Sequence, residues 1–249
     1  MTALSSFTDV FQVPWNDYVG SIAGGLLRTL GYTVASFIGA TILGLALALM
    51  RLNRLRLVRV PAAFYTELFK NVPLLAIIFL TYFGLPSVGI RLEVFEAGVL
   101  SLVLFYAAYL SEIFRAAIAG VHQGQQEASQ ALGLGRGKTF THVVLPQAVR
   151  LALPGTNTMF VDLIKSTSLL VTISAAELMT QAQLIASETF RGLEVYLVIS
   201  TAYFAICYPV SQCLLLLERK IHAGVPLSLA RRRRLKLART YLAEGKICP

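Results

Sequence analysis

The chain has 249 residues, of which 56% are hydrophobic and only 14% are charged, and its formal net charge is +9. Soluble domains usually carry about a quarter charged residues, so this composition excludes an ordinary soluble protein. The apolar residues lie in blocks long enough to cross a bilayer, which takes about 20 helical residues. The basic residues lie at the ends of these blocks without interleaved aromatic residues. That pattern favours topology-setting charge and contact with anionic lipid over nucleic-acid binding.

In chain order, the apolar blocks predict an all-α polytopic membrane protein with five spans. The expected spans are residues 29–50, 61–84, 97–119, 152–179 and 194–217. They form one transmembrane domain, 29–217. An extracytoplasmic or interfacial segment, 1–28, precedes this domain, and Trp15 and Tyr18 within it are aromatic residues of the kind found at membrane interfaces. A basic tail, 218–249, follows the domain.

The distribution of Arg and Lys predicts the orientation of the chain. Three segments expected on one side of the membrane contain sixteen basic residues: Arg51, Arg54, Arg56, Arg59, Arg136, Lys138, Arg150, Arg219, Lys220, Arg231, Arg232, Arg233, Arg234, Lys236, Arg239 and Lys246. The opposite segments contain three, which are Arg28, Arg91 and Arg191. The positive-inside rule therefore predicts that the N-terminus faces out and the C-terminus faces in. It also makes the polar loop at 120–150 cytoplasmic.

Neither a metal site nor a catalytic centre is indicated. Cys207, Cys213 and Cys248 form no CxxC pair. The three histidines are scattered over the expected cytoplasmic segments, with no HExxH motif and no paired-carboxylate constellation. We therefore expect no metal, no bound cofactor and no enzymatic activity in this chain.

Two of the expected spans contain oppositely charged residues at helical spacing. Glu67 and Lys70 lie three apart in the second span, and Asp162 and Lys165 lie three apart in the fourth. Residues at i and i+3 are neighbours on one helix face, so each pair can partly neutralise itself. Ionisable groups at membrane depth cost several kcal/mol unless they are paired or hydrated, and they usually face the interior of the bundle.

The fourth span also carries a polar stripe. Its members are Thr158, Asp162, Lys165 and Thr172, with Asn157, Ser166, Thr167 and Ser168 beside them. A helix this polar must line a wet cavity or pack against partner helices. For any single residue a purely structural role between helices is as plausible as a solute contact, but the stripe as a whole favours a polar path. Glu112 and Arg115 form a third pair, which we interpret as interfacial because it lies near the cytoplasmic end of the third span.

Pro73 should kink the second span just after Lys70, because proline removes a backbone hydrogen bond. In transporters, a helix break beside a charge frees backbone groups to meet a solute. An ordinary proline kink, common in membrane helices, is the alternative.

The polar loop is expected to contain a short amphipathic helix. Residues 125–132 are good helix formers, and Gly133, Gly135 and Gly137 then end the helix. The apolar residues of this element are Leu132, Leu134, Phe140, Val143, Val144 and Leu145. Such a helix lies on a membrane surface or docks into the groove of a partner, and composition does not separate the two.

Seven residues of the loop carry a recognisable pattern: Glu127, Ala128, Ser129, Gly133, Val143, Leu145 and Pro146. This spacing resembles the EAA loop of ATP-binding-cassette import permeases, with Ser129 and Val143 as conservative departures. The flanks resemble the polar amino acid uptake family of these permeases over most of the chain. The matching stretches are 65–75 (YTELFKNVPLL), 108–120 (AYLSEIFRAAIAG), 124–127 (GQQE), 145–150 (LPQAVR) and 164–170 (IKSTSLL). Lys70 stands where the family usually has arginine, which hydrogen-bonds with a different geometry.

The resemblance implies a mechanism and a set of partners. The loop would form a coupling helix, with Glu127, Ala128 and Gly133 seated in a cleft of a cytoplasmic ATPase subunit. Closure of an ATPase dimer around ATP and Mg²⁺ would rock two permease subunits, identical or paralogous, between inward- and outward-open states. An extracytoplasmic solute-binding protein would deliver the solute. The chain contains no GxxxxGK[ST] motif, so the ATP chemistry is expected on another polypeptide.

The resemblance also implies a location and a substrate class, namely the bacterial cytoplasmic membrane and polar or charged amino acids or related compounds such as opines. The expected solute path comprises Glu67, Lys70, Asp162, Lys165, Ser166, Thr167 and Ser168. Its carboxylates suit a basic group and its lysines suit a carboxylate. The alternative is a self-contained secondary transporter or channel. That class would explain the intramembrane charges but not the EAA spacing, and no inverted repeat is evident.

Overall fold

A computed structural model of the chain describes residues 13–223, which are almost entirely helical and contain no strand within that range. The elements are α2 (Trp15–Arg51), α3 (Arg56–Asn71), α4 (Leu74–Phe79), the π-helical η2 (Leu80–Gly84), the 3-10 helix η3 (Leu85–Val88), α5 (Val94–Ala119), α6 (Gln123–Ala131), α7 (Arg136–Thr139), the π-helical η4 (Phe140–Val144), α8 (Leu145–Ser166), the 3-10 helix η5 (Thr167–Ile173), α9 (Leu178–Thr189) and α10 (Gly192–Ala223). The predicted all-α class is confirmed for this part of the chain. Cys248 and most of the basic tail, including the arginine run at 231–234, lie outside the described residues.

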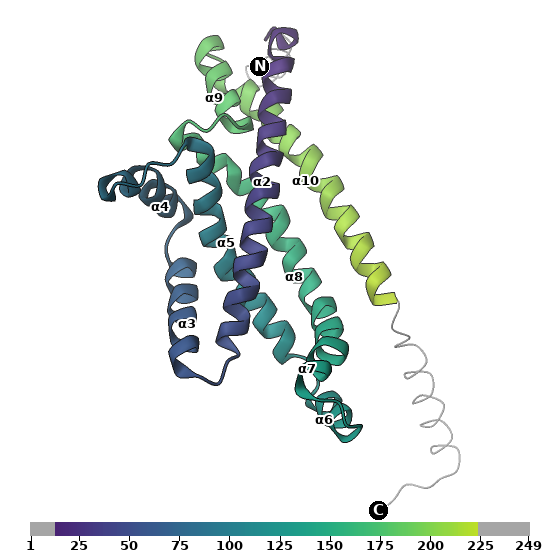
Figure 1. Ribbon diagram of the computed structural model, residues 1–249. Coiled ribbons are helices and arrows are strands. Elements are labelled where there is room, and N and C mark those ends of the chain that lie inside the picture. Colours follow the sequence, from purple (N-terminus) through teal and green to yellow (C-terminus); the bar gives the residue numbers. More distant parts are fainter. Residues whose placement is uncertain (1–12, 224–249) are drawn as a thin grey trace, which may run out of the picture.

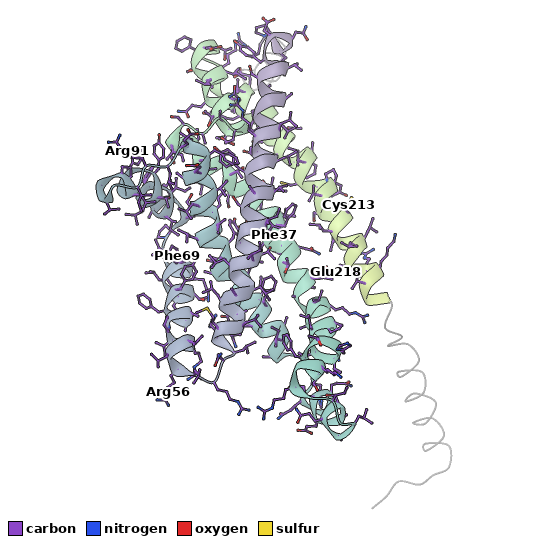
Figure 2. The ribbon with its side chains drawn as sticks, viewed as in Figure 1. Phe37, Arg56, Phe69, Arg91, Cys213 and Glu218 are labelled. Atoms are coloured by element: carbon purple, nitrogen blue, oxygen red, sulfur yellow. The ribbon has the colours of Figure 1, made fainter. Side chains whose placement is uncertain are left out.

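The helices form an elongated bundle in which α2, α5 and α8 run side by side (Figure 1). Helix α5 packs against α2, α3 and α8, while α10 packs on α8 and α9 and diverges from the bundle toward its C-terminal end (Figure 1). The α2–α3 turn, α6 and α7 lie at one end, and the start of α2 and helix α9 lie at the other. Arg56 is at the α6 end and Arg91 is near the opposite end (Figure 2).

Among the described residues, three helices are long and apolar enough to cross a membrane: α2, α5 and α10. Two bent pairs also pass the same test when each is taken together. The segments Arg56–Asn71 and Leu74–Val88 meet at 107°, and Arg136–Ile173 and Leu178–Thr189 meet at 51°. Counting each bent pair as one span gives up to five.

The break between α3 and α4 occurs at Pro73, where the sequence predicts a kink. Val72 has extended backbone angles and its N–H still bonds to Leu68 O at 3.1 Å, but Pro73 has no N–H to continue the ladder. Proline also disfavours helical angles in the residue before it, so the chain turns sharply at this point. The kink predicted just after Lys70 is therefore present within the expected span 61–84. The segment is two helices at a steep angle.

Helix α8 differs from the expected span 152–179 at both ends. It begins at Leu145, directly after the π-helical η4, with Pro146 as its second residue. At the other end, η5 tightens the helix and Ser174, with a left-handed φ of 56°, ends it. Helix α9 then follows in a stretch for which the sequence predicted no element.

The first helix begins at Trp15, well before the predicted span start at residue 29. Residues 15–28, expected as a separate interfacial segment, are the first turns of α2. Trp15 and Tyr18 pack against a buried cluster from α9 and α10 that includes Leu178 and Val195. This packing extends α2 beyond the apolar run that hydropathy identifies. Residues 1–12 lie outside the described part.

Helices α2 and α5 cross closely because small residues lie at their contact. A Cβ atom on Gly44 would lie 3.0 Å from Leu110 Cβ, 3.1 Å from Ala107 O and 3.2 Å from Ser111 N. Ala40 and Ala107 are fully buried at the same contact. In lipid the hydrophobic effect does not drive helices together, so close approach of backbones through small residues is a main source of association. The α2–α5 pair is therefore the frame of the bundle.

Replacing Gly44 with alanine should destabilise the protein, since the added methyl would contact backbone atoms that cannot rotate away. Overpacking of this kind costs about 1–3 kcal/mol. We expect a lower thermal unfolding midpoint for the detergent-solubilised variant. Gly31→Ala is the matched control, because it lies on the same helix and its added Cβ would meet no heavy atom within 4 Å. Equal midpoints for the two variants would contradict a close α2–α5 crossing.

Candidate coupling loop and solute groove

The coupling loop is built around α6, which begins after His122 and ends at Gly133. The Nδ1 atom of His122 accepts a hydrogen bond from Gly124 N at 3.1 Å and caps the first turn. At the other end, Leu134 N donates to Ser129 O at 3.1 Å and Gly133 N donates to Gln130 O at 2.9 Å. This is a Schellman motif, which requires a left-handed residue at Gly133, whose φ is 79°.

The predicted coupling residues divide between two faces of this loop. Glu127, Ala128 and Gly133 are exposed on the outward face, together with Leu132, whose exposed fraction of 82% is unusual for a leucine. Ser129 is buried instead. Its Oγ lies 2.8 Å from Gln126 O and 3.1 Å from Thr139 Oγ1, so it joins α6 to α7. The structure therefore gives Ser129 an internal contact rather than a place on the exposed face.

The remaining predicted residues, Val143, Leu145 and Pro146, lie where η4 leads into α8. Val143 and Leu145 are half-buried and Pro146 is exposed. Of the predicted apolar face of the loop, Phe140 and Val144 turn inward onto a small cluster that contains Val121, Ala148 and Ile118. The loop is thus an ordered extension of α8 with its own core.

An arginine from another helix joins the predicted Glu112–Arg115 pair. Glu112 is bridged to Arg115 on its own helix and to Arg51 at the end of α2. The sequence predicted only the i, i+3 contact, because the Arg51 contact depends on how α2 and α5 pack. Glu112 therefore ties the α2–α3 turn to α5, at the same end of the bundle as α6.

The second predicted site, on α8, centres on Asp162 and Lys165. Lys165 Nζ lies 3.4 Å from Asp162 Oδ1, and both side chains are about half exposed. Tyr106 of α5 donates its hydroxyl to Asp162 Oδ2 at 2.9 Å and lies 2.7 Å from Ser166 Oγ. Tyr106 is buried and was not predicted as a site residue. Its hydrogen bond fixes Oδ2 of Asp162, and Oδ1 stays on the side that faces Lys165.

Asp162 and Lys165 face a groove of about 360 Å³ between α8 and α10. Asn157 and Thr158 of α8 also line it, together with Glu218 of α10, which the sequence did not single out. Asn157 Nδ2 lies 3.5 Å from Glu218 Oε2. Figure 2 shows Glu218 beside α8, on the half of α10 nearer the α6 end. The stripe residues Thr158, Asp162 and Lys165 therefore line one groove, whose other lining includes Val161, Leu214 and Leu215.

Three neighbouring residues of the predicted path, Ser166, Thr167 and Ser168, do not line the groove. Thr167 is fully buried and its hydroxyl donates to Ile164 O at 2.8 Å, so it does not line this groove. Ser168 Oγ donates to Lys165 O at 2.7 Å. Both residues begin η5, where the tighter helical turn rotates their side chains away from the groove side of α8. Thr172, expected on the stripe, lies further along η5 and does not line the groove.

The Glu67–Lys70 pair lies on a different side of α5. Its N–O distance is 3.9 Å, and Tyr109 of α5 donates to Lys70 O at 3.3 Å. Helix α5 lies between α3 and α8 in Figure 1, and both helices pack against it. A single chain therefore does not bring the two predicted charge pairs into one site.

A buried carboxylate at the opposite end of the molecule was also missed. Glu177 is fully buried and caps α9 by accepting hydrogen bonds from Met179 N at 2.8 Å and Thr180 N at 2.7 Å. Tyr203 of α10 donates to it at 3.0 Å. Glutamate is not among the residues preferred at an N-cap, and the contact with α10 depends on packing, so no sequence pattern indicates either role.

The described residues thus form a bundle of apolar helices with an exposed polar loop at one end, and a groove between α8 and α10 that a charged pair lines. Residues 40–223 match the family described as "Binding-protein-dependent transport system inner membrane component", and the chain belongs to this family. Because members of this family are the permease subunits of importers whose ATPase is a separate chain, this chain is a permease subunit and not an enzyme.

Individual relatives agree with the family. The "Probable glutamine ABC transporter permease protein GlnM" of Bacillus subtilis is 34% identical over 197 residues, covering 79% of this chain and 91% of the relative. The L-cystine transport system permease protein TcyB of the same organism is 34% identical over 214 residues, covering 84% and 92%. The resemblance to ATP-binding-cassette import permeases is confirmed.

Solved structures agree as well. The chain is similar to a crystal structure of an amino acid ABC transporter with histidines, with a TM-score of 0.79 and 33% identity, covering 83% of this chain and 96% of the other. Its fold also matches an inward-facing conformation of the MetNI methionine ABC transporter, with a TM-score of 0.71 at 16% identity, covering 82% and 98%.

Replacing Gly133 with alanine should loosen the end of α6, because left-handed backbone angles cost an L-residue about 1–2 kcal/mol. We expect faster amide hydrogen exchange at Leu134, whose N–H closes the Schellman motif. Gly135→Ala is the matched control, since Gly135 has a φ of −64° and equal space around it. Gly133→Asn should restore part of the protection, because asparagine tolerates this conformation. Unchanged exchange in Gly133→Ala would contradict a conformational role for the glycine.

Proposed function

We propose that this chain forms the membrane path of an importer for polar or charged amino acids, or related compounds such as opines, in the bacterial cytoplasmic membrane. The observation that carries the proposal is the groove between α8 and α10, where Asp162 and Lys165 present both signs of charge. Amino acids carry both an ammonium and a carboxylate group. The names of the relatives, which include glutamine, cystine and amino-acid transporters, support the same substrate class.

We infer a five-span topology in which each bent pair counts as one crossing. The N-terminus faces out, the polar loop and the C-terminus face the cytoplasm, and the spans share one domain over about 29–217. This orientation is supported by the arginine-rich α2–α3 turn, which lies at the same end of the bundle as α6 and α7 (Figure 1). Basic residues concentrate on the cytoplasmic side of membrane proteins.

In this proposal the exposed face of α6 is the docking site for a cytoplasmic ATPase dimer, which carries ATP and Mg²⁺. Glu127, Ala128 and Gly133 contact the ATPase cleft, and Leu132 supplies an apolar anchor of the kind that docked helices use. A second permease subunit completes the membrane path, and an extracytoplasmic solute-binding protein delivers the solute. The family description, which names binding-protein-dependent transport, supports these partners.

A displacement of α6 by the ATPase would reach the groove along α7, η4 and α8, which follow one another as uninterrupted helix. Ser129 joins α6 to α7 through Thr139, and α7 continues through η4 into α8 without a break in helical structure. Val143, Leu145 and Pro146 lie at that junction. Because Asp162 and Lys165 are on α8 itself, a displacement of α6 would shift the groove relative to α5 and α10. After the short turn at 132–135, which the Ser129–Thr139 contact bridges, no loop lies between α7 and the solute path.

At the solute path, Asp162 would accept the ammonium of the solute and Lys165 would meet its carboxylate. The two side chains pair with each other at 3.4 Å, and a zwitterionic solute offers each of them an equivalent partner. Ser166 would help to position Asp162, because both residues contact the hydroxyl of Tyr106. Glu67 and Lys70 form a second polar surface on the α3 side of α5 and belong to a different stretch of the path.

Replacing Glu127 with alanine should abolish ATP-driven uptake, because the proposed contact with the ATPase is lost. Membrane insertion should persist, because the side chain is exposed and does not hold the fold together. The double variant with Gly133→Ala should be equally inactive. Gln123→Ala, at the exposed start of the same helix, is the matched control and should transport normally. Uptake and ATPase activity of the reconstituted complex provide the measurement. Undiminished uptake in the double variant would remove the coupling role from this face.

Replacing Asp162 with asparagine should raise the KM for uptake of a cationic amino acid by about tenfold or more, since hydrogen bonds to charged groups contribute about 1.5–3 kcal/mol. The side chain is half exposed, so the fold should survive. Asp17→Asn, an exposed carboxylate at the start of α2, controls for loss of charge. Uptake kinetics in proteoliposomes with the ATPase and binding protein measure the effect. Equal KM values in both variants would exclude Asp162 from the path.

A further inference from the structure

A hollow of about 450 Å³ lies at the α6 end of the molecule, between the coupling loop and the α2–α3 turn. Its polar rim comes from three separate segments: Arg54 from the turn, Gln126 and Gln130 from α6, and Arg136 from the start of α7. The groove between α8 and α10 shares none of these residues. The hollow is therefore distinct from the solute groove.

The floor of this hollow is apolar. It is formed by Ile118, Phe140 and Val144, which belong to the small hydrophobic cluster beneath the coupling loop. Ile118 lies in the last turn of α5, one of the helices apolar enough to cross a membrane. The hollow thus lies at the end of a helix that can span the membrane, with apolar side chains on its floor and arginines on its rim.

The charges around the hollow are unbalanced. No carboxylate lines it, and within residues 13–223 neither Arg54 nor Arg136 has an ion pair. Two guanidinium groups that face one hollow repel each other, and an anion between them removes that repulsion. The planar fork of arginine matches the oxygens of a phosphate and binds them through paired hydrogen bonds. Gln126 and Gln130 add neutral donors to the same rim.

The hollow and the proposed ATPase-docking face lie on different sides of α6. At 100° per residue, Gln126 and Gln130 lie within about 40° of each other, while Glu127 and Ala128 are rotated from Gln126 by about 100° and 200°. A partner seated on Glu127 and Ala128 therefore leaves the Gln126 side facing Arg54 and the end of α5. This side faces the membrane boundary.

We propose that this hollow binds the phosphate headgroup of an anionic phospholipid from the cytoplasmic leaflet. The two arginines hold the phosphate, and Ile118, Phe140 and Val144 contact the glycerol and upper acyl region. Such an amphipathic ligand satisfies both the cationic rim and the apolar floor, whereas a soluble anion satisfies the rim alone. The bound lipid would bridge Arg54 in the first cytoplasmic turn and Arg136 in the coupling loop, and so steady the loop on which the ATPase acts.

The test uses the purified permease in complex with its ATPase, in phosphatidylcholine nanodiscs with or without phosphatidylglycerol. Retained lipid is measured by native mass spectrometry and its affinity by titration. Arg54→Gln with Arg136→Gln should weaken phosphatidylglycerol binding by about tenfold or more, because both charge-assisted guanidinium–phosphate contacts are lost. Arg56→Gln with Arg59→Gln is the matched control. It removes the same charge from the same end of the molecule, but neither residue lines the hollow.

Selective loss of phosphatidylglycerol in the Arg54/Arg136 variant, with the ATPase still bound and the unfolding midpoint unchanged, supports the site. Equal loss in both double variants would overturn it, because the attraction would then be diffuse surface charge. Displacement of the lipid by millimolar inorganic phosphate would overturn the lipid as ligand in favour of a soluble anion. Loss of the ATPase from the Arg54/Arg136 variant alone would mean that the rim contacts the ATPase instead.

Discussion

The close crossing of α2 and α5 is the constraint on which the other elements depend. In lipid, a leucine gains little by leaving acyl chains for another helix, so association rests on backbone proximity and on polar contacts between helices. Gly44 provides the proximity, because a side chain there would strike the backbone of α5. The other helices attach to this pair through a few polar groups: Tyr65 of α3 bonds to Leu104 O, Thr66 of α3 lies 3.1 Å from Ser111 Oγ, and Tyr106 bonds to α8. A helix bonded in this way can pivot about the frame without exposing unsatisfied backbone groups to lipid.

Tyr106 links this frame to function. Its hydroxyl contacts Asp162 and Ser166 together, so the same residue that packs α8 on α5 also orients the carboxylate in the groove. A hydrogen bond inside a low-dielectric region is stronger than in water, and leaving either partner unsatisfied there is costly. The geometry of the groove therefore depends on how α8 sits on α5. By contrast, the hydrogen bond from Tyr109 to α3 goes to the backbone oxygen of Lys70 and not to a charged side chain.

Features encoded locally could be predicted from the sequence, whereas features that depend on packing could not. The position of the break at Pro73 and the helix end at Gly133 follow from the backbone angles those residues prefer, and the structure has both. The 107° angle depends on what α4 packs against, which no local signal contains. Hydropathy assigned the first turn of α8 to the loop, because its residues are partly polar and include a proline. The contacts of Glu112 with Arg51 and of Asp162 with Tyr106 join residues more than fifty positions apart. Helical periodicity in the sequence indicates only neighbours on one helix, so it does not predict these contacts.

The coupling loop shows why a departure from a motif can leave the fold intact. Ser129 stands where the EAA pattern has alanine, and it is buried, so an unsatisfied hydroxyl there would be destabilising. Thr139 supplies the compensation, since its Oγ1 is within hydrogen-bond distance of Ser129 Oγ and of Leu134 O. The added hydroxyl therefore becomes a link between α6 and α7 that an alanine lacks. Because α7 continues through η4 into α8, this contact joins α6 to the helix that carries Asp162 and Lys165.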